Sequence, residues 1–201
     1  MSTIAILLLA AGASSRMRGR DKLLEEISGQ PLLSMICARA AQTGLPCYAM
    51  VPDLAHPRVS ATGTAQVIAV PQAAEGMAAS IRTGVGKIAV LSPSVEALMI
   101  LPCDMPDLQT QDLTHLAAHF HGADSPVLRA SSSDGTPGHP VIFPRRCFAA
   151  LEQISGDQGA RAVLKGERVQ LVALPGQRAL TDLDTPEAWA QWRANQHSAP
   201  T

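Results

Sequence analysis

The residues best suited to chemistry lie near the N-terminus, where four cationic side chains follow a turn of small residues. The cations are Arg16, Arg18, Arg20 and Lys22. The turn at residues 10–15 has little side-chain bulk, so its backbone N–H groups can approach a ligand closely. Donors and cations in this order predict a site for a small polyanion, most simply a triphosphate. The alternative is an ordinary strand-to-loop junction whose charges face solvent.

Carboxylates form a second group. Asp104 follows the apolar run 97–101, and an acidic residue just past a buried strand is placed to hold a hard cation such as Mg²⁺. Asp182 and Asp184 are spaced i, i+2, so in an extended segment both side chains point to the same face. Each carboxylate has a structural alternative, because Asp side chains also cap loops and turns.

Several other chemistries are not indicated. After Gly12 no Gly-Lys-Ser/Thr follows, which argues against a Walker loop. The missing Gly-x-Gly-x-x-Gly fingerprint argues against a dinucleotide-dependent oxidoreductase. The four cysteines show no C-x-x-C spacing, so neither a zinc site nor a redox pair is predicted, and reduced thiols in a cytoplasmic protein are expected.

The elements that must position these residues alternate along the first part of the chain. Strands are predicted at 4–9, 48–51, 66–70 and 97–101, and helices at 31–41, 76–85 and 110–120. This order predicts βαβ crossovers and a mostly parallel sheet, which binds ligands at the carboxyl ends of its strands. The loops at Gly12, 71–75 and 102–106 are therefore expected along one rim.

The second half is less regular. Strands are predicted at 126–129, 141–143 and 169–174, and helices at 145–153, 159–164 and 186–194. The Ser/Gly/Pro-rich segment 131–139 is predicted to be a loop, with Thr185 capping the last helix. The prediction is one three-layer α/β/α domain over residues 1–194, with 195–201 as a disordered tail.

Composition narrows the class of protein. The 201 residues are 46% hydrophobic but only 3% aromatic, so the core must consist of Ala, Leu, Val and Ile. A net charge of −1 argues against nucleic-acid or membrane-surface binding. The start of the chain lacks a basic region before its apolar run, so a secretory signal is not expected. We expect a cytoplasmic monomer or weak homodimer.

The chain resembles the molybdenum cofactor cytidylyltransferases and their guanylyltransferase relatives from Leu7 to Trp189. The first loop matches a signature that begins L-A-x-G-x-S-x-R-M and continues to a lysine. Further matches are C-D-M-P at 103–106, G-M-x-x-S-I-R at 76–82, G-H-P at 138–140, G-D-x-G-A-R at 156–161 and D-x-D-T-P-E at 182–187. Arg18 departs from the family's usual Gly, and its cation could contact phosphate or face solvent.

The resemblance implies a Rossmann-like nucleotidyltransferase fold of the glycosyltransferase-A-like kind, and a role for each matched residue. Implied catalytic residues are Arg16, Lys22 and Asp104, and Mg²⁺ is held by Asp104 and Asp184. Implied nucleotide-binding residues are Leu9, Ala10, Ala11, Gly12, Ala13, Ser14, Lys22, Pro71, Ser80 and Cys103. His139 and Asp157 are implied on the acceptor side. From the residues alone, Ser80 could be a small helix residue, His139 a structural hydrogen-bonding residue and Asp157 a helix cap.

The implied reaction joins a nucleotide to Mo-molybdopterin. The acceptor's phosphate attacks the α-phosphorus of a nucleoside triphosphate and releases pyrophosphate, and a molybdoenzyme then receives the product. Ala11 adds a methyl group where the guanylyltransferases usually have Gly, which favours CTP over GTP. The alternatives are a GTP-dependent enzyme, a sugar-phosphate or methylerythritol-phosphate nucleotidyltransferase, and a non-catalytic carrier of the finished cofactor.

Overall fold

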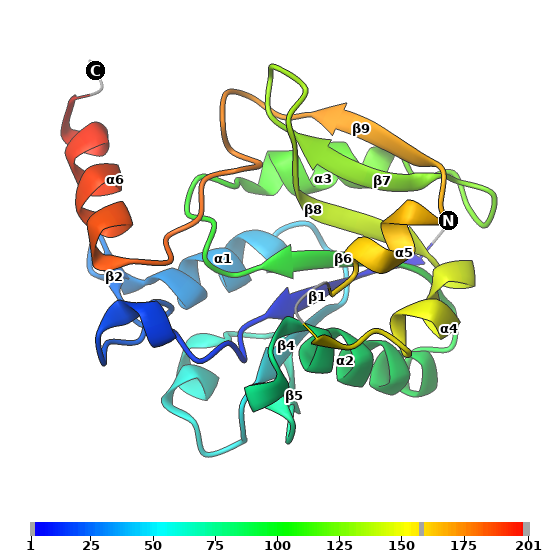
Figure 1. Cartoon of the computed structure of the whole chain (residues 1–201), viewed down its shortest axis with the longest axis horizontal. Helices are drawn as coiled ribbons and strands as arrows, with labels where there is room; N and C mark the ends of the chain where they lie inside the picture. The colour runs from blue at the N-terminus through cyan, green and yellow to red at the C-terminus, as the bar shows by residue number, and fades with distance from the viewer. Residues whose placement is uncertain (1–2, 157–158, 199–201) are drawn as a thin grey trace.

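The central element is one mixed β-sheet. A computed structural model describes residues 3–156 and 159–198. Seven strands pair in the order β5-β4-β1-β6-β8-β7-β9 (Figure 1). Their bounds are β1 Thr3–Leu9, β4 Cys47–Val51, β5 Gln66–Ala69, β6 Val95–Pro102, β7 Val127–Ser131, β8 Pro137–Pro144 and β9 Val169–Ala173. A separate two-stranded hairpin pairs β2 (Glu26–Ile27) with β3 (Gln30–Pro31).

Strand direction decides where loops can form a site. β1 lies between β4 and β6 and is parallel to both, whereas β8 runs antiparallel to both of its neighbours, β6 and β7. The predicted mostly parallel α/β sheet is therefore confirmed. Because β1 and β6 are parallel neighbours, the loop after Leu9 and the loop after Pro102 leave the same edge of the sheet.

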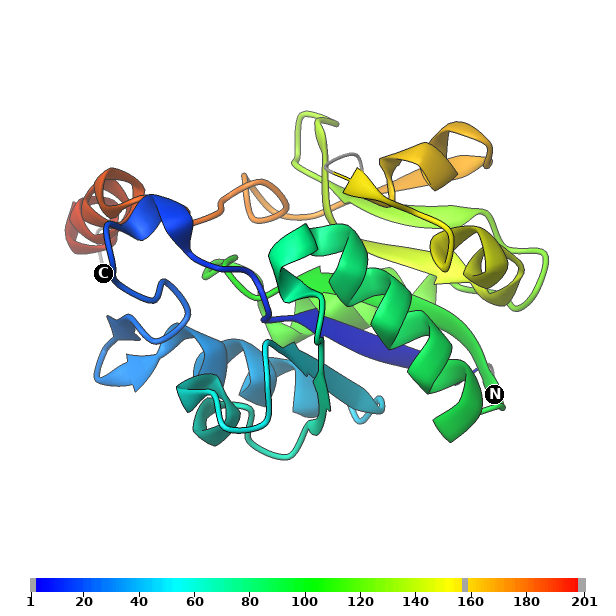
Figure 2. The same ribbon diagram turned by 60° about the horizontal axis from the view of Figure 1, so that its bottom comes forward.

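Helices cover both faces of this sheet. Along β1, Ile4, Ile6 and Leu8 join one buried cluster and Ala5 and Leu7 the other, as the period of two in a strand requires. Helices α1 (Leu32–Ala41) and α3 (Thr110–Ala118) pack on the first face. Helices α2 (Met77–Leu91) and α4 (Phe148–Leu151) pack on the second. Figure 2 shows α1 and α2 on opposite sides of β1, which confirms the three-layer arrangement.

Shorter elements complete the fold. The 3-10 helices are η1 Ser15–Met17, η2 Pro57–Ala61, η3 Ala73–Glu75 and η4 Arg145–Cys147. The remaining α-helices are α5 (Arg161–Lys165) and α6 (Pro186–Ser198). Within the described ranges, no helix has the length and apolar character needed to cross a lipid bilayer.

Two expectations from the sequence are corrected. Segment 131–139 is mostly strand, because Ser131 pairs with Pro137 across β7 and β8, and only residues 132–136 form the connecting turn. The disordered tail predicted for 195–201 is wrong for 195–198, since α6 continues to Ser198, and residues 199–201 lie outside the described residues. Trp189 is only 2% exposed and anchors α6, and Gln191 Nε2 donates to Asn195 Oδ1 at 3.0 Å along its surface. The predicted cap is confirmed, with Thr185 Oγ1 accepting from the Ala188 N–H.

Close contact between α2 and β1 gives a test of this packing. A Cβ on Gly84 would lie 2.4 Å from Leu7 Cδ1, inside the buried core. We expect Gly84→Ala to lower the free energy of unfolding by about 1–3 kcal/mol through overpacking. Gly86→Ala, on the same helix, meets nothing closer than 3.6 Å and should be neutral or stabilising. Urea unfolding of both variants measures the difference, and equal stabilities would contradict this packing.

Candidate active site

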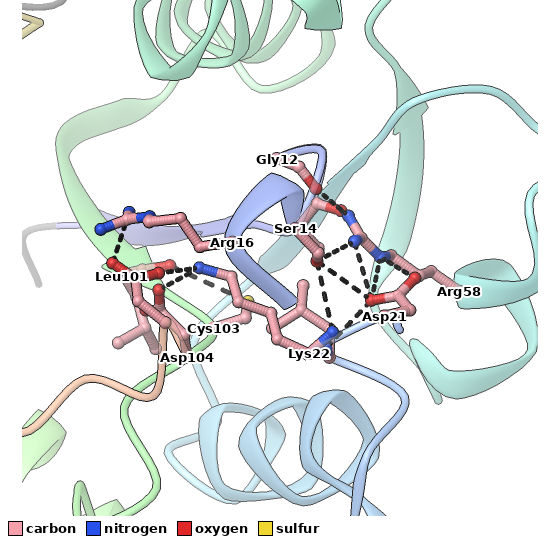
Figure 3. A network of polar contacts seen from close by, with 12 residues as sticks. Gly12, Ser14, Arg16, Asp21, Lys22, Arg58, Leu101, Cys103 and Asp104 are labelled. Carbon is pink, nitrogen blue, oxygen red and sulfur yellow. Dashed lines mark hydrogen bonds and ion pairs between the residues drawn. The ribbon is translucent and has the colours of Figure 1, made fainter. Parts of the chain in front are cut away.

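A buried arginine holds the loop that follows β1. Arg58, from η2, is 2% exposed, and its guanidinium reaches into the loop (Figure 3). Nη1 donates to the carbonyl oxygens of Ala10 at 2.6 Å and Gly12 at 2.8 Å. Nε and Nη2 each donate to the Asp21 carboxylate at 2.8 Å, and Nη2 also reaches Ser14 Oγ at 3.0 Å. One side chain thus joins both ends of the loop.

Asp21 completes this arrangement from inside the loop. Burial by itself raises the pKa of the Asp21 carboxyl, but the Arg58 guanidinium outweighs that effect and leaves the pKa below its usual value. Asp21 Oδ1 also accepts from the Leu23 N–H at 3.0 Å, and the Lys22 N–H donates to Ser14 Oγ at 3.3 Å. The ionised carboxylate therefore fixes the chain on both sides of Lys22 and directs its side chain.

Lys22 lies between the two carboxylates expected to bind metal. Its Nζ is 2.6 Å from Asp104 Oδ2 and 2.6 Å from Asp184 Oδ1. Arg16 Nη2 lies 2.6 Å from Asp184 Oδ2. Burial lowers the pKa of Lys22, but the two carboxylates outweigh burial, so its pKa is raised and the ammonium stays charged. Asp104 and Asp184, which are 82 and 162 residues away from Lys22 in the sequence, thus both contact its ammonium group.

Backbone contacts bring the second acidic segment to Asp104. The Leu183 N–H donates to the Asp104 carbonyl oxygen at 3.0 Å. The His139 N–H donates to the Ala179 carbonyl oxygen at 2.9 Å, and a Cβ on Gly138 would lie only 2.0 Å from that oxygen. Gly138 therefore permits an approach that a larger residue would prevent.

Burial and the nearby Asp184 and Asp104 charges raise the pKa of Asp182.

A central cleft of about 350 Å³ opens over this acidic centre. Beside it lies a side cavity of about 190 Å³ with largely apolar walls. Met77, Arg129, His139 and Arg161 line both spaces. Burial, followed by the Arg129 charge, lowers the pKa of His139 to about 4, so its imidazole is neutral at neutral pH. The cleft thus combines cations, carboxylates and a neutral imidazole.

The structure gathers some of the predicted residues and separates others. Arg16, Lys22, Asp104, His139 and Asp184 all line the central cleft, together with Asp182. Gly12, Ala13 and Ser14 line a different hollow, of about 270 Å³, together with Arg58. The other residues predicted to bind nucleotide are not among the described residues that line the cleft, the side cavity or the hollow. They are Leu9, Ala10, Ala11, Pro71, Ser80 and Cys103. Their roles stay predictions.

Burial limits how those residues could contact a ligand. Ala10, Ala11, Ser80 and the Cys103 thiol are buried, Leu9 is half-buried and Pro71 is exposed past β5. Asp157 lies outside the described residues, so its predicted acceptor role is not addressed. Arg18 is exposed and forms an ion pair with Glu187 on α6. The backbone φ of Arg18 is 53°, in the left-handed region. The Gly that the family usually has at this position would adopt that conformation without strain.

Asp104 and Asp184 fit a divalent cation. Their oxygens already share one cationic centre at 2.6 Å, and two carboxylates with phosphate oxygens and water form a common Mg²⁺ site. Over residues 3–156 and 159–198, no three His, Cys, Asp or Glu side chains gather as a complete protein cage. The donor set therefore suits a metal that is shared with a phosphorylated substrate.

No sequence pattern indicated a role for Arg58, since it lies in an irregular stretch without periodicity. We expect Arg58→Met to lower the free energy of unfolding by about 3–5 kcal/mol, because Asp21 and two carbonyl groups lose their donor. Arg20→Met removes an exposed ion pair with Glu25 and should cost less than about 1 kcal/mol. Guanidinium unfolding compares the two variants. A small cost at Arg58 would show that it does not hold the loop.

Comparison with known proteins agrees with this geometry. The MobA-like NTP transferase domain matches residues 6–173. Molybdenum cofactor guanylyltransferase of Ectopseudomonas mendocina is 30% identical, over 92% of this chain and 90% of its own. A probable molybdenum cofactor guanylyltransferase of Nostoc sp. is 27% identical, over 93% of this chain and 89% of its own.

Solved structures share the fold. The crystal structure of Rv0371c from Mycobacterium tuberculosis H37Rv has a TM-score of 0.79 at 24% identity, over 98% of this chain and 99% of its own. The crystal structure of Rv0371c in complex with manganese has a TM-score of 0.78 at 22% identity, over 98% of this chain and 100% of its own. Both comparisons extend along the whole sheet and its helices. The chain is a nucleotidyltransferase and belongs to the MobA-like NTP transferase domain family.

Proposed function

We propose that the protein transfers CMP from CTP to the phosphate of Mo-molybdopterin, releasing pyrophosphate. The observation that carries this proposal is the Lys22 ammonium held between Asp104 and Asp184, with Arg16 beside it. Arg16 and Lys22 belong to the segment that follows β1, and Asp104 follows the adjacent parallel strand β6, at the edge where such sheets bind nucleotides. Asp184 reaches them from the segment before α6. Relatives named molybdenum cofactor guanylyltransferase support the acceptor.

The reaction needs positioning rather than an activated protein nucleophile. The acceptor's phosphate has a second pKa of about 6, so it is mostly dianionic at neutral pH. One of its oxygens attacks the α-phosphorus, a new P–O–P bond forms, and the bond from the α-phosphorus to the bridging oxygen breaks. Pyrophosphate leaves with that electron pair. Arg16 and Lys22 offset the charge that develops on the α-phosphate and the leaving group.

Asp104 and Asp184 would hold the divalent metal, which we propose to be Mg²⁺. When bound, such an ion neutralises phosphate charge and aligns the triphosphate for in-line displacement. Lys22 must first exchange its two carboxylate partners for phosphate oxygens. The backbone N–H groups of Ala13 and Ser14, in the loop that Arg58 supports, would bind the triphosphate tail. The manganese complex of Rv0371c supports a divalent cation in this fold.

The choice between CTP and GTP as the donor nucleotide rests on residue 11. Ala11 is 3% exposed and carries a methyl group where the guanylyltransferases usually have Gly, and this extra bulk is our reason for proposing the smaller pyrimidine. One methyl group supplies about 1–3 kcal/mol of discrimination. The names of the curated relatives favour GTP as the second candidate.

Pyrophosphate release with Mg²⁺ and Mo-molybdopterin, measured for CTP, GTP, ATP and UTP in parallel, tests the reaction. We expect selective turnover of CTP. Preferential turnover of GTP would replace the nucleotide but keep the acceptor. Turnover only with a sugar phosphate or methylerythritol phosphate as acceptor would contradict the molybdopterin assignment.

Asp104→Asn should lower the rate of pyrophosphate release at least about a hundredfold, because it removes one of two carboxylate charges from the metal site. Asp124→Asn changes an exposed loop carboxylate that is not among the residues lining the cleft, and it serves as the matched control. Thermal unfolding verifies that both variants stay folded. Near-normal turnover in Asp104→Asn would remove Asp104 from the metal site.

Lys22→Met should strengthen binding of Mn²⁺ in the absence of nucleotide by at least about tenfold, while turnover is lost. The reason is that the ammonium and the metal compete for the same two carboxylates. Arg20→Met, which removes a cation paired with Glu25 outside this centre, should leave Mn²⁺ affinity unchanged. Isothermal titration calorimetry measures both. Unchanged affinity in Lys22→Met would show that lysine and metal occupy different positions.

A further inference from the structure

The two carboxylates proposed to hold metal come from segments that lie far apart in the sequence. Asp104 belongs to the loop 103–109 between β6 and α3, and Asp184 to the segment 174–185 between β9 and α6. Two carboxylates share one divalent cation only if their oxygens are held at a suitable spacing. The Leu183 N–H joins the segments by donating to the Asp104 carbonyl oxygen at 3.0 Å. One hydrogen bond leaves the segments free to pivot, so a fixed spacing needs a second attachment.

The side chain of Asp112, on α3, supplies that second attachment. Its Oδ2 accepts from the Gln109 N–H at 2.9 Å, at the end of the loop that carries Asp104. Its Oδ1 and Oδ2 accept from Arg178 Nη1 at 3.2 and 3.3 Å, on the segment that carries Asp184. One carboxylate therefore joins the two segments a second time. We call Asp112 and Arg178 the anchor pair.

Helix capping accounts for only part of this arrangement. Asp112 is at position N3 of α3, and its contact with the Gln109 N–H is one half of a capping box. A capping carboxylate can face water, whereas Asp112 is 4% exposed. The contact with Arg178 has no part in a cap. Because burial of a carboxylate is costly without a cation, the two members of the anchor pair depend on each other.

The loop that carries Asp104 is also held independently of the anchor pair. Arg39 of α1 donates from Nη1 to the carbonyl oxygen of Pro106 at 2.6 Å and to that of Leu108 at 2.8 Å. This loop should therefore keep its place when the anchor pair is removed. The effect of the anchor pair then falls mainly on the segment that carries Asp184.

We propose that the anchor pair positions the metal site: through Arg178, Asp112 holds Asp184 at the spacing that a divalent cation needs. This inference rests on the proposed metal site and names the groups that set its geometry. Asp112 is not among the described residues that line the central cleft, so it acts through Arg178 and not on a ligand. Lys22 bridges Asp104 and Asp184 inside the cleft. When Lys22 turns to phosphate oxygens, the anchor pair still holds the two carboxylates together.

Binding of Mn²⁺ to the full chain, without nucleotide or turnover, tests this role. Arg178→Met removes the cation of the anchor pair, and Arg178→Lys restores one. Asp112→Asn is a second variant, because it keeps an acceptor for the cap but loses the charge that holds Arg178. Arg146→Met is the matched control, since Arg146 is 39% exposed, against 38% for Arg178, pairs with Glu167 and does not line the cleft. Isothermal titration calorimetry measures affinity at a temperature where thermal unfolding shows each variant to be folded.

We expect Mn²⁺ to bind about tenfold more weakly to Arg178→Met and Asp112→Asn, with recovery in Arg178→Lys and no change in Arg146→Met. Hydrogen exchange of the Leu183 N–H should become faster in the two weakened variants, because its segment has lost an attachment. Unchanged Mn²⁺ affinity in both, or an equal loss in Arg146→Met, would overturn the proposal.

Failure of the metal site and failure of the anchor pair give different results. If the wild type does not bind Mn²⁺, the proposed metal site is wrong, and hydrogen exchange decides the remaining claim. Faster exchange of the Leu183 N–H in Arg178→Met, but not in Arg146→Met, would retain the anchor pair as the group that positions Asp184. Unchanged exchange would overturn the anchor pair as well.

Discussion

The site depends on one buried guanidinium. The loop after β1 must present backbone donors to an anion, so its carbonyl groups and its acidic residue need partners elsewhere. Arg58 supplies them, donating to Ala10, Gly12, Ser14 and Asp21 from a position that is 2% exposed. The cost of burying this charge is offset because each of the three guanidinium nitrogens donates to an acceptor. The loop held in this way carries Lys22, which lines the central cleft between Asp104 and Asp184.

The charge pattern of the cleft follows from that placement. Lys22 joins Asp104, at the end of β6, to Asp184, on the segment before α6, and so links the first and last parts of the chain. Arg129 and Arg161 line the same cleft, so cations from three parts of the chain share one space with these carboxylates. The transfer proposed above needs several cations, because both of its substrates carry phosphate charge.

Much of this could be predicted from the sequence, because strand-to-loop junctions leave local patterns. The apolar run of β1, the cations after Gly12 and the position of Asp104 after β6 all have this local origin. Arg58 could not be predicted, since its partners are 37 residues or more away. The sequence predicts a strand at 141–143 but a loop at 137–139, because this part contains Pro137 and Gly138, yet Pro137 pairs with Ser131 of β7 and begins β8. The close approach of Gly138 to Ala179 likewise depends only on tertiary structure.

The central claim is that the protein positions two phosphates for direct displacement and forms no covalent intermediate with the nucleotide. The stereochemical course at the α-phosphorus tests this most directly. We would use the α-phosphorothioate of CTP, chiral at phosphorus, with Mo-molybdopterin and Mg²⁺, and determine the configuration of the product. A single in-line attack predicts inversion. Retention of configuration, or a nucleotidylated protein, would contradict the account.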